Sequence, residues 1–375
     1  MNRSAAVFVV YFLFLVARAP AQDVHFLSVP RGYLDGKVSL GPGNSALALT
    51  PDPEDPNFVY AAGFFDGAPR IVRLNLTNEA RTVVFNAPTT VAVNGLAAPA
   101  ADLIYISDNW NDHLYVLQDH NPKDGDFDDP GELRELIEPI LTHPTWGWTG
   151  SACLVVPSGA NHLGLPAGTV LFQSEDGETT QGEVLAVVDP VTSPTFQPPG
   201  GAYFSGFNYG GGLAIDSQGR LLVASSFFPD PGKVWICEDT SGDGVIGDGE
   251  SNVLVPQAVS TSDSVGLSGL TIDNADRGYV CVGKGFAGSA LTEIRRFSIP
   301  ADPLHSTTET VTFATLNSPY VSSLILNATA KSFEPNSLDG ATMVISASDP
   351  FWGNPDYLLT LRAYGSLGVK QWMHY

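Results

Sequence analysis

The chain has 375 residues, a formal net charge of −22, 43% hydrophobic residues and 15% charged residues. The apolar fraction is large enough to build a core and excludes wholesale disorder. The acidic balance repels phosphate backbones and anionic lipid, so nucleic acid and polybasic-type membrane binding are not expected. The 38 glycines and 28 prolines favour turns over long helices.

Residues 1–21 have the layout of a secretory signal peptide. A positively charged start at residues 2–4 precedes an uncharged apolar run at residues 5–17, and residues 19–21 form a small-x-small cleavage site. This run is too short to span a bilayer, and no other stretch reaches the ~18 apolar residues of a membrane span. The alternative is a buried N-terminal helix. The sequence predicts a secreted or periplasmic protein whose residues 22–375 form a single domain.

A short repeat dominates the mature chain. Two small residues followed by an apolar strand recur six times, at intervals of about 55 residues. The third residues of the six copies are Leu47, Leu96, Cys153, Leu213, Leu270 and Leu324. This period has room for four short strands per unit and predicts an all-β fold, a six-bladed β-propeller of four-stranded antiparallel blades. Val24–Val29 and Leu358–Tyr364 would close the last blade. A pair of β-sandwiches or a β-helix fits the period less well.

An acidic loop lies between the third and fourth predicted strands of blade two. Its candidate oxygen ligands for calcium are Asp119, Asn121, Asp124, Asp126, Asp128 and Glu132. An extra residue between Asn121 and Asp124 breaks the standard spacing of a calcium loop. Both a calcium site and a solvated acidic turn remain open for this segment.

Blade four shows the repeat most clearly. Its stretch Gly212–Ala224, Gly-Leu-Ala-Ile-Asp-Ser-Gln-Gly-Arg-Leu-Leu-Val-Ala, resembles the NHL-repeat and gluconolactonase-like six-bladed propellers. The resemblance implies a fold. In gluconolactonase-like enzymes, Glu, Asn and Asp at strand starts hold a catalytic metal in the central channel. The corresponding positions here are Asn44, Asn94, Thr149, Gly210, Leu267 and Val321. None is a carboxylate, so that activity is not expected to carry over.

A second acidic loop lies between the third and fourth strands of blade four. Its candidate calcium ligands are Asp239, Ser241, Asp243, Val245 through its carbonyl, Asp248 and Glu250. Together with the turn at Gly244, this is the twelve-residue pattern that folds six to eight oxygens around calcium. It resembles the loops of EF-hand and dockerin modules, but strands flank it instead of helices. The closing ligand is therefore Glu250 or Asp248. A solvated turn would leave its carboxylates repelling each other.

The opposite face of the disc is predicted to be aromatic. It combines the loops between second and third strands with the linkers between blades, including Tyr203, Phe204 and Phe207. Aromatic rings beside carboxylates suit a sugar or another amphipathic ligand. The candidate ligand-binding residues are Asp108, Trp110, Trp146, Trp148, Phe227, Asp349 and Trp352. The alternative is that these aromatics fill the spaces between wedge-shaped blades.

No catalytic residues are predicted from motifs. The sequence has no GxSxG, HExxH or nucleotide-binding loop, and its seven histidines are scattered. Buried thiols are the default for Cys153, Cys237 and Cys281, with a Cys237–Cys281 bridge as the alternative. We expect a secreted binding or scaffold module with structural Ca²⁺ and a glycan or protein ligand. The alternative is a secreted hydrolase or lyase acting on carbohydrate or lactone, with Asp108, Asp349 or His143 as acid and base.

Overall fold

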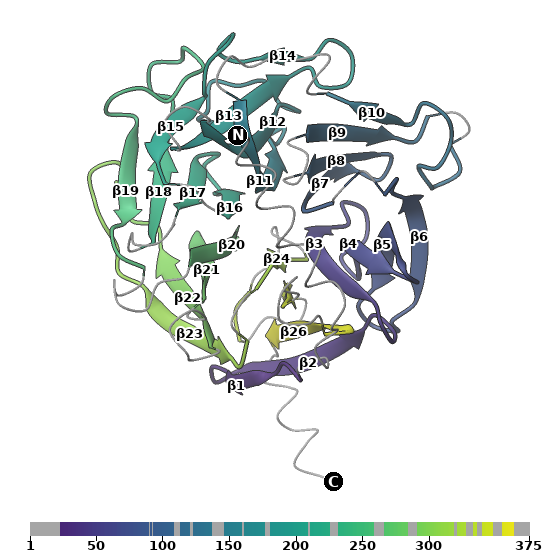
Figure 1. Ribbon diagram of the computed structural model, residues 1–375. Helices are drawn as coiled ribbons and strands as arrows, with labels where there is room; N and C mark the ends of the chain where they lie inside the picture. Colours follow the sequence, from purple (N-terminus) through teal and green to yellow (C-terminus); the bar gives the residue numbers. More distant parts are fainter. Residues whose placement is uncertain are drawn as a thin grey trace, which may run out of the picture.

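The computed structural model arranges its strands in six antiparallel sheets around a central axis (Figure 1). It describes residues 23–89, 91, 93–108, 113–120, 123–136, 146–159, 161–176, 181–208, 211–225, 232–258, 266–283, 291–318, 321–327, 333–335, 340–347 and 355–363. Within these ranges the protein is all-β, with no helix. The expected six-bladed propeller is thus confirmed. The segment expected to be a signal peptide lies outside the described residues.

Each blade starts at the axis and continues outward. Blade one contains β3 (Ser45–Pro51), β4 (Phe58–Phe65), β5 (Ala68–Asn75) and β6 (Arg81–Asn86). Blade two contains β7 (Gly95–Ala100), β8 (Leu103–Asp108), β9 (His113–Gln118) and β10 (Leu133–Glu135). Blade three contains β11 (Trp146–Val155), β12 (Val170–Asp176), β13 (Gly182–Val188), β14 (Thr195–Phe196) and β15 (Phe204–Phe207).

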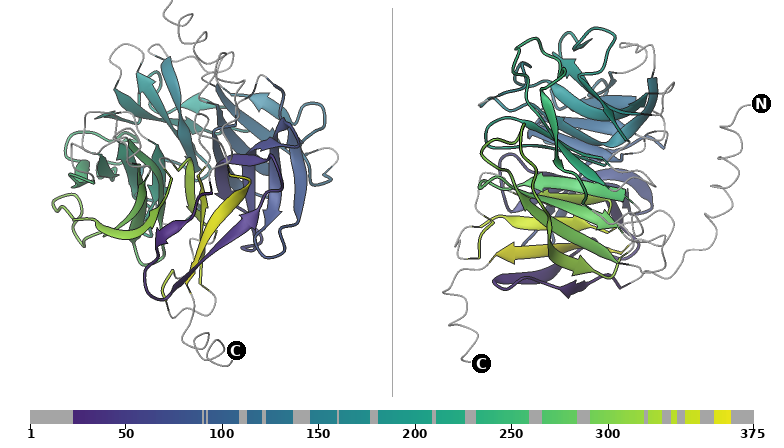
Figure 2. Two further views of the ribbon diagram at one scale, coloured as in Figure 1. Left: turned by 60° about the horizontal axis from the view of Figure 1, so that its bottom comes forward. Right: turned by 90° about the vertical axis from the view of Figure 1, so that its left-hand side faces the viewer.

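The remaining blades follow the same order. Blade four contains β16 (Gly212–Ile215), β17 (Leu221–Ser225), β18 (Lys233–Cys237) and β19 (Ser251–Val255). Blade five contains β20 (Gly266–Ile272), β21 (Arg277–Gly283), β22 (Thr292–Ser298), β23 (Val311–Leu316) and β1 (Phe26–Ser28). Blade six contains β24 (Ser323–Leu326), β25 (Thr342–Ser346), β26 (Tyr357–Ala363) and β2 (Tyr33–Ser39). Seen from the side, the blades form a disc (Figure 2, right).

The hairpin between β16 and β17 shows how the repeat folds locally. All five residues of β17 are buried, because this strand is covered by blades on both sides. At the turn, Asp216 Oδ1 accepts the N–H groups of Gln218 (3.0 Å) and Arg220 (2.8 Å), and its Oδ2 accepts Arg220 Nε (2.7 Å). Asp273 and Arg277 repeat this arrangement in blade five. A buried aspartate that pairs with an arginine therefore fixes two equivalent hairpins.

The ring is closed by an N-terminal strand that differs from the expected one. Strand β2 pairs with β26 along its whole length, from Tyr33 opposite Ala363 to Ser39 opposite Tyr357. The segment expected to close the ring, Val24–Val29, instead contributes β1, which pairs with β23 at the outer edge of blade five. The expectation for this segment was wrong. The longer β2 makes more ladder hydrogen bonds, whereas the short β1 covers a sheet edge.

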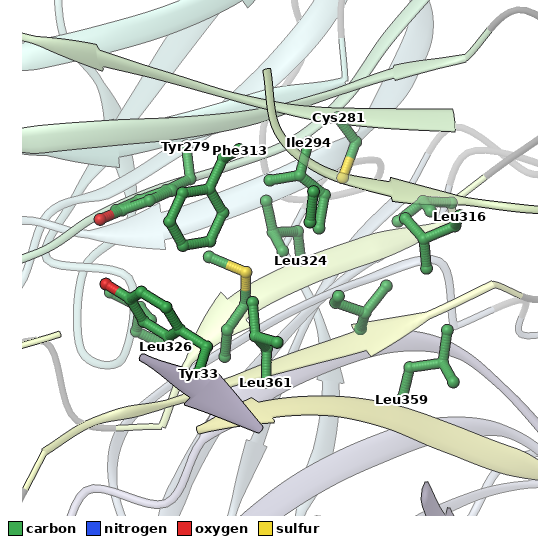
Figure 3. Close-up of a cluster of buried hydrophobic side chains, with 14 of the residues drawn as sticks. Tyr33, Tyr279, Cys281, Ile294, Phe313, Leu316, Leu324, Leu326, Leu359 and Leu361 are labelled. Carbon is green, nitrogen blue, oxygen red and sulfur yellow. The ribbon is translucent and has the colours of Figure 1, made fainter. Parts of the chain in front are cut away.

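The core consists of apolar clusters between neighbouring blades. The cluster between blades five and six contains Tyr33, Tyr279, Phe313 and Phe333 (Figure 3 labels the first three). The ring centroids of Tyr33 and Tyr279 each lie 5.1 Å from that of Phe313, in edge-to-face geometry. The Tyr33 hydroxyl donates to the Phe333 carbonyl at 2.8 Å. This cluster joins the first part of the chain to the last two blades.

The three cysteines are not disulfide-bonded. Cys237 belongs to the cluster between blades three and four, and Cys281 to the cluster between blades five and six. The alternative of a Cys237–Cys281 bridge was therefore wrong, since the two thiols are buried on different blades. No helix in the described ranges is both long and apolar enough to cross a membrane.

Candidate metal centre

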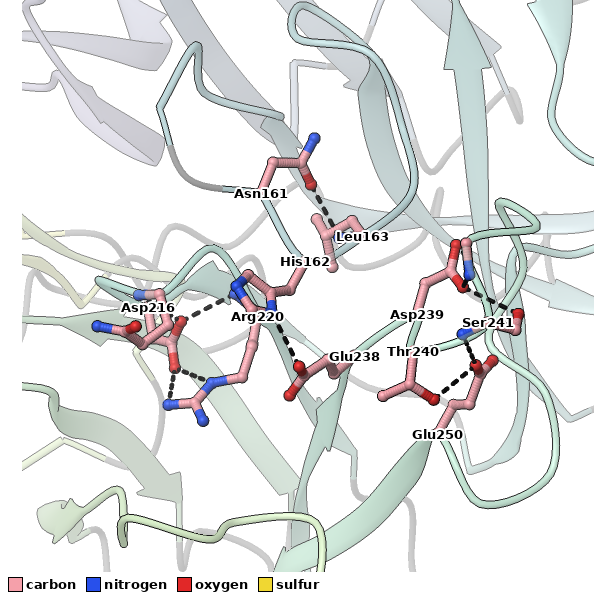
Figure 4. A network of polar contacts seen from close by, with 12 residues as sticks. Asn161, His162, Leu163, Asp216, Arg220, Glu238, Asp239, Thr240, Ser241 and Glu250 are labelled. Carbon is pink, nitrogen blue, oxygen red and sulfur yellow. Dashed lines mark hydrogen bonds and ion pairs between the residues drawn. The ribbon is translucent and has the colours of Figure 1, made fainter.

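Three carboxylates converge in the loop between β18 and β19. One oxygen each from Asp239, Asp243 and Glu250 lies within 4.8 Å of the others. Asp239 and Glu250 are buried, whereas Asp243 is exposed. Figure 4 shows Asp239 and Glu250 facing each other across the loop. In the described part of the chain, no ion pair joins these acids to Lys or Arg. The arrangement concentrates negative charge that a bound cation would neutralise.

The loop folds around Asp239. Its Oδ1 accepts the N–H of Gly242 at 2.6 Å, and its Oδ2 accepts the N–H of Gly244 at 2.7 Å. Both glycines have positive φ, 76° and 79°, a conformation that costs an L side chain roughly 1–2 kcal/mol. The Asp243 N–H also donates to Asp239 Oδ1, at 3.3 Å, so the two glycines let three consecutive amides point at one carboxylate.

Glu250 closes the loop from the other end. Its Oε2 accepts the Gly247 N–H at 2.9 Å, and its Oε1 accepts the Ser241 N–H at 2.7 Å and the Thr240 hydroxyl at 3.0 Å. The backbone N–H groups of Gly247 and Ser241 lower the pKa of Glu250 because they stabilise its charged form. At neutral pH the side chain is an anion, which is the form that binds a hard cation.

The other expected ligands of this loop differ in their hydrogen bonds and in their exposure. The Ser241 hydroxyl donates to Asp239 Oδ1 at 3.1 Å, and the Val245 N–H donates to Asp243 Oδ1 at 3.0 Å. Asp248 is exposed and lies outside the group of three carboxylates. Of the two candidates for the closing position, the structure brings Glu250 into the group.

An apolar residue ties the loop to the neighbouring blade. The Ile246 N–H donates to the Tyr203 carbonyl at 2.9 Å, and its side chain packs in the cluster between blades three and four with Phe204 and Phe207. Since one loop contributes both Ile246 and the carboxylates, its conformation is coupled to the packing between these blades. Tyr203, Phe204 and Phe207 are buried, so for them the filling of space between blades is confirmed.

Gly164 is a site residue that the sequence reasoning missed. A Cβ at this position would lie 1.8 Å from Asp239 Oδ2, and its φ is 63°. It belongs to the long connection between β11 and β12, where the His162 carbonyl also accepts the Asp239 N–H at 2.8 Å. The His162 ring contacts Glu238, with 2.7 Å between Nδ1 and Oε1 (Figure 4). Blade three therefore supports the acidic loop of blade four, a contact that no local sequence pattern indicates.

The acidic loop of blade two lies between β9 and β10, on the same face of the disc as the first, as expected. Asp119 and Glu132 are buried, whereas Asp124 is exposed and Asp126 half-buried. Both Asp128 oxygens accept hydrogen bonds from Asn86 of blade one, so Asp128 bridges two blades. Asn121 lies outside the described residues.

The axis of the propeller contains a cavity of about 710 Å³ lined by the inner strands of all six blades. Its described lining includes no Asp, Glu, His, Lys or Arg side chain. Burial raises the pKa of the Cys153 thiol in this lining to about 12, so it remains protonated at neutral pH and is a poor nucleophile. The described lining thus provides neither a general base nor an activated thiol.

The expected aromatic face falls mostly outside the described residues. This is so for Trp110, Phe227, Asp349 and Trp352, for His143, and for the side chains of Trp146 and Trp148, whose backbones belong to β11. Asp108 is fully buried at the end of β8, opposite His113 in the strand pairing. Ligand binding by these residues remains a prediction.

Comparison with known proteins gives the fold. No family model and no curated protein match the chain. A gluconolactonase from Xanthomonas campestris matches with a TM-score of 0.55 and 12% identity, over 93% of this chain and 98% of that one. The PQQ-bound aldose sugar dehydrogenase from Streptomyces coelicolor matches with a TM-score of 0.52 and 12% identity, over 92% and 99%. The chain is therefore a six-bladed β-propeller with gluconolactonase-like structural neighbours.

Proposed function

We propose that this protein is a calcium-stabilised propeller that acts as a secreted binding or scaffold module. The observation that carries the proposal is the group of three carboxylate oxygens from Asp239, Asp243 and Glu250, within 4.8 Å of one another. Calcium takes six to eight oxygen ligands in flexible geometry, and carboxylates from a short loop are its usual partners. Such a loop suits a compartment outside the cytosol, where weak calcium sites of extracellular modules are occupied.

The calcium part is tested by metal stoichiometry and thermal unfolding with calcium and with EGTA. A ligand that binds only the folded state at 1,000 times its Kd adds about 4 kcal/mol to stability, so calcium should raise the Tm. Glu250→Gln should remove most of this shift. The control Asp248→Asn removes an equal charge from an exposed position outside the triad and should keep it. A wild-type chain without bound calcium and with the same Tm in EGTA would overturn the proposal.

The binding part concerns the predicted aromatic face. Its ligand would be a glycan or a protein that stacks on aromatic rings beside carboxylates. Glycan-array binding in calcium should weaken more than tenfold in the variant Trp110→Ala/Trp352→Ala. The control Leu34→Ala changes a side chain that is 49% exposed on β2 at the rim and should have no effect. Unchanged binding in the double variant would reject the aromatic face as the ligand site.

The alternative is a hydrolase or lyase acting on carbohydrate or lactone. The names of the two structural neighbours favour it, although 12% identity establishes the fold only. Against it, acid–base chemistry needs titratable groups within reach of the substrate, and the described lining of the axial cavity has no Asp, Glu, His, Lys or Arg side chain and only the Cys153 thiol with its raised pKa. Turnover of any sugar or lactone in a panel, lost in Asp349→Asn, would favour the enzyme over the binding module.

A further inference from the structure

The two acidic loops share a hydrogen-bond framework despite their different lengths. In each loop, a glycine that directly follows an aspartate donates its N–H to the first aspartate of the loop. Gly244 donates to Asp239 Oδ2 at 2.7 Å, and Gly125 donates to Asp119 Oδ2 at 2.9 Å. The closing glutamate accepts an N–H from three residues earlier in both, at 2.9 Å for Glu250 and 3.0 Å for Glu132. The described parts of the two loops therefore share two hydrogen bonds at equivalent positions.

The likeness between the two loops extends to their contacts with the preceding blade. The Phe127 N–H donates to the Val84 carbonyl of β6 at 2.7 Å, as Ile246 does to Tyr203. Phe127 is buried in the cluster between blades one and two. Both loops thus insert an apolar residue between their own blade and the one before it.

One carboxylate oxygen in the blade-two loop is buried without a partner. Asp119 is 5% exposed, and its Oδ1 has no hydrogen-bond donor among the described residues. The equivalent Asp239 Oδ1 accepts bonds from Ser241, Gly242 and Asp243. A buried carboxylate oxygen without a partner is costly. The Gly125 N–H of the same loop donates to Asp119 Oδ2, so the loop encloses the Asp119 carboxylate. The oxygen without a partner, Oδ1, belongs to this enclosed carboxylate.

The cation nearest in sequence is engaged elsewhere. Lys123 Nζ lies 2.5 Å from Asp102 Oδ2, and this contact lowers the pKa of Asp102. In the described residues, no Lys or Arg forms an ion pair with Asp119, Asp124 or Glu132. These acids also do not form a group as tight as the blade-four triad.

We propose that the 119–132 loop is a second calcium site, formed by Asp119, Asp124 and Glu132, that assembles when the ion binds. The inference rests on the proposed calcium role of the 239–250 loop. The three carboxylates of this loop must move closer together around the ion, whereas oxygens of the blade-four group already lie within 4.8 Å of one another. Because part of the binding free energy is used for this rearrangement, calcium binds here about tenfold more weakly than at the blade-four loop. The ion satisfies Asp119 Oδ1 and, through Phe127, strengthens the contact between blades one and two.

The test is isothermal titration of the chelator-treated full chain with calcium alone. Wild type should bind two ions in two phases. Asp119→Asn should remove the weaker phase and keep the stronger, whereas Glu250→Gln should do the reverse. The matched control Asp129→Asn changes an acid of the same loop whose backbone N–H, not its carboxylate, holds Glu132. It should keep both phases.

A second readout separates binding from misfolding. Amide exchange at Phe127 should slow by about tenfold or more when calcium is raised through the weak phase, in wild type and not in Asp119→Asn. One ion in wild type, lost only in Glu250→Gln, with unchanged Phe127 exchange, would overturn the second site and leave the first intact. Absence of any bound calcium would remove both.

Discussion

Neighbouring blades of this propeller are joined in two different ways. Blades five and six meet in an aromatic cluster that includes Tyr33, Tyr279 and Phe313. Blades three and four meet in a second apolar cluster and through the acidic loop 239–250, which places Ile246 between them. The first junction combines this cluster with an Arg277–Glu334 ion pair, whereas the second includes three carboxylates that form no ion pair with Lys or Arg in the described part of the chain. On the proposed calcium role of the 239–250 loop, we expect calcium to stabilise the second junction and not the first, although the blades share one architecture.

The largest expected effect is at the aromatic junction. Phe313→Ala removes a buried ring at the centre of the cluster and should cost about 3–5 kcal/mol. Denaturant unfolding should give the same loss in calcium and in EGTA, because neither acidic loop contributes a described residue to this cluster. The control Val311→Ala truncates a side chain that is 53% exposed on the same strand and should change stability little. A calcium-dependent Phe313→Ala effect would break the distinction between the junctions.

A smaller effect is expected at Gly164, which packs against Asp239 of the acidic loop 239–250. Gly164→Ala places a Cβ against the Asp239 carboxylate and adds left-handed strain, together about 3 kcal/mol. Gly168→Ala is the matched control, because its φ is 84° but a Cβ there would meet nothing within 4 Å; it should cost only the strain. Calcium affinity should fall in Gly164→Ala and not in the control. Equal affinity in the two variants would show that Gly164 does not support the site.

The smallest effect is expected at alkaline pH. Burial raises the pKa of Tyr33 to about 12 from an ordinary value of 10.0. A raised folded-state pKa contributes stability that is fully present below pH 10 and is lost as pH rises from 10 through 12. The Tm should therefore fall over this range in calcium and EGTA alike. Tyr33→Phe should make the decline shallower, at a cost of about 1 kcal/mol for the lost hydrogen bond. An unchanged dependence of Tm on pH in Tyr33→Phe would show that Tyr33 does not contribute to the loss of stability at alkaline pH.

Much of the fold could be predicted because the repeat is local. The alternation of small residues and short apolar strands, and the turn Asp216–Arg220, are encoded within a few residues of each other. Both acidic loops were placed correctly between third and fourth strands for the same reason. The strand that closes the ring was not predicted correctly, because β2 pairs with β26 across more than 300 residues of sequence, as from Tyr33 to Ala363. Pairing at that distance depends on competition between two N-terminal segments.

The site divides in a similar way. Oxygen ligands and glycines at fixed spacing predicted the 239–250 loop without help from the rest of the chain, because a loop around one ion is a local structure. In contrast, the extra residue between Asn121 and Asp124 left the 119–132 loop open between a calcium site and a solvated turn. The hydrogen bonds that the two loops share are visible only in the structure.

By itself, the sequence determined the blade number, the strand order within each blade and the position of both acidic loops. The tertiary structure decided that Glu250 and not Asp248 joins Asp239 and Asp243, that Gly164 supports them from blade three, and that Asp128 reaches Asn86. The physical reason is that strands, turns and ion-binding loops depend on neighbours in sequence. Contacts between blades depend on which surfaces the closed ring brings together.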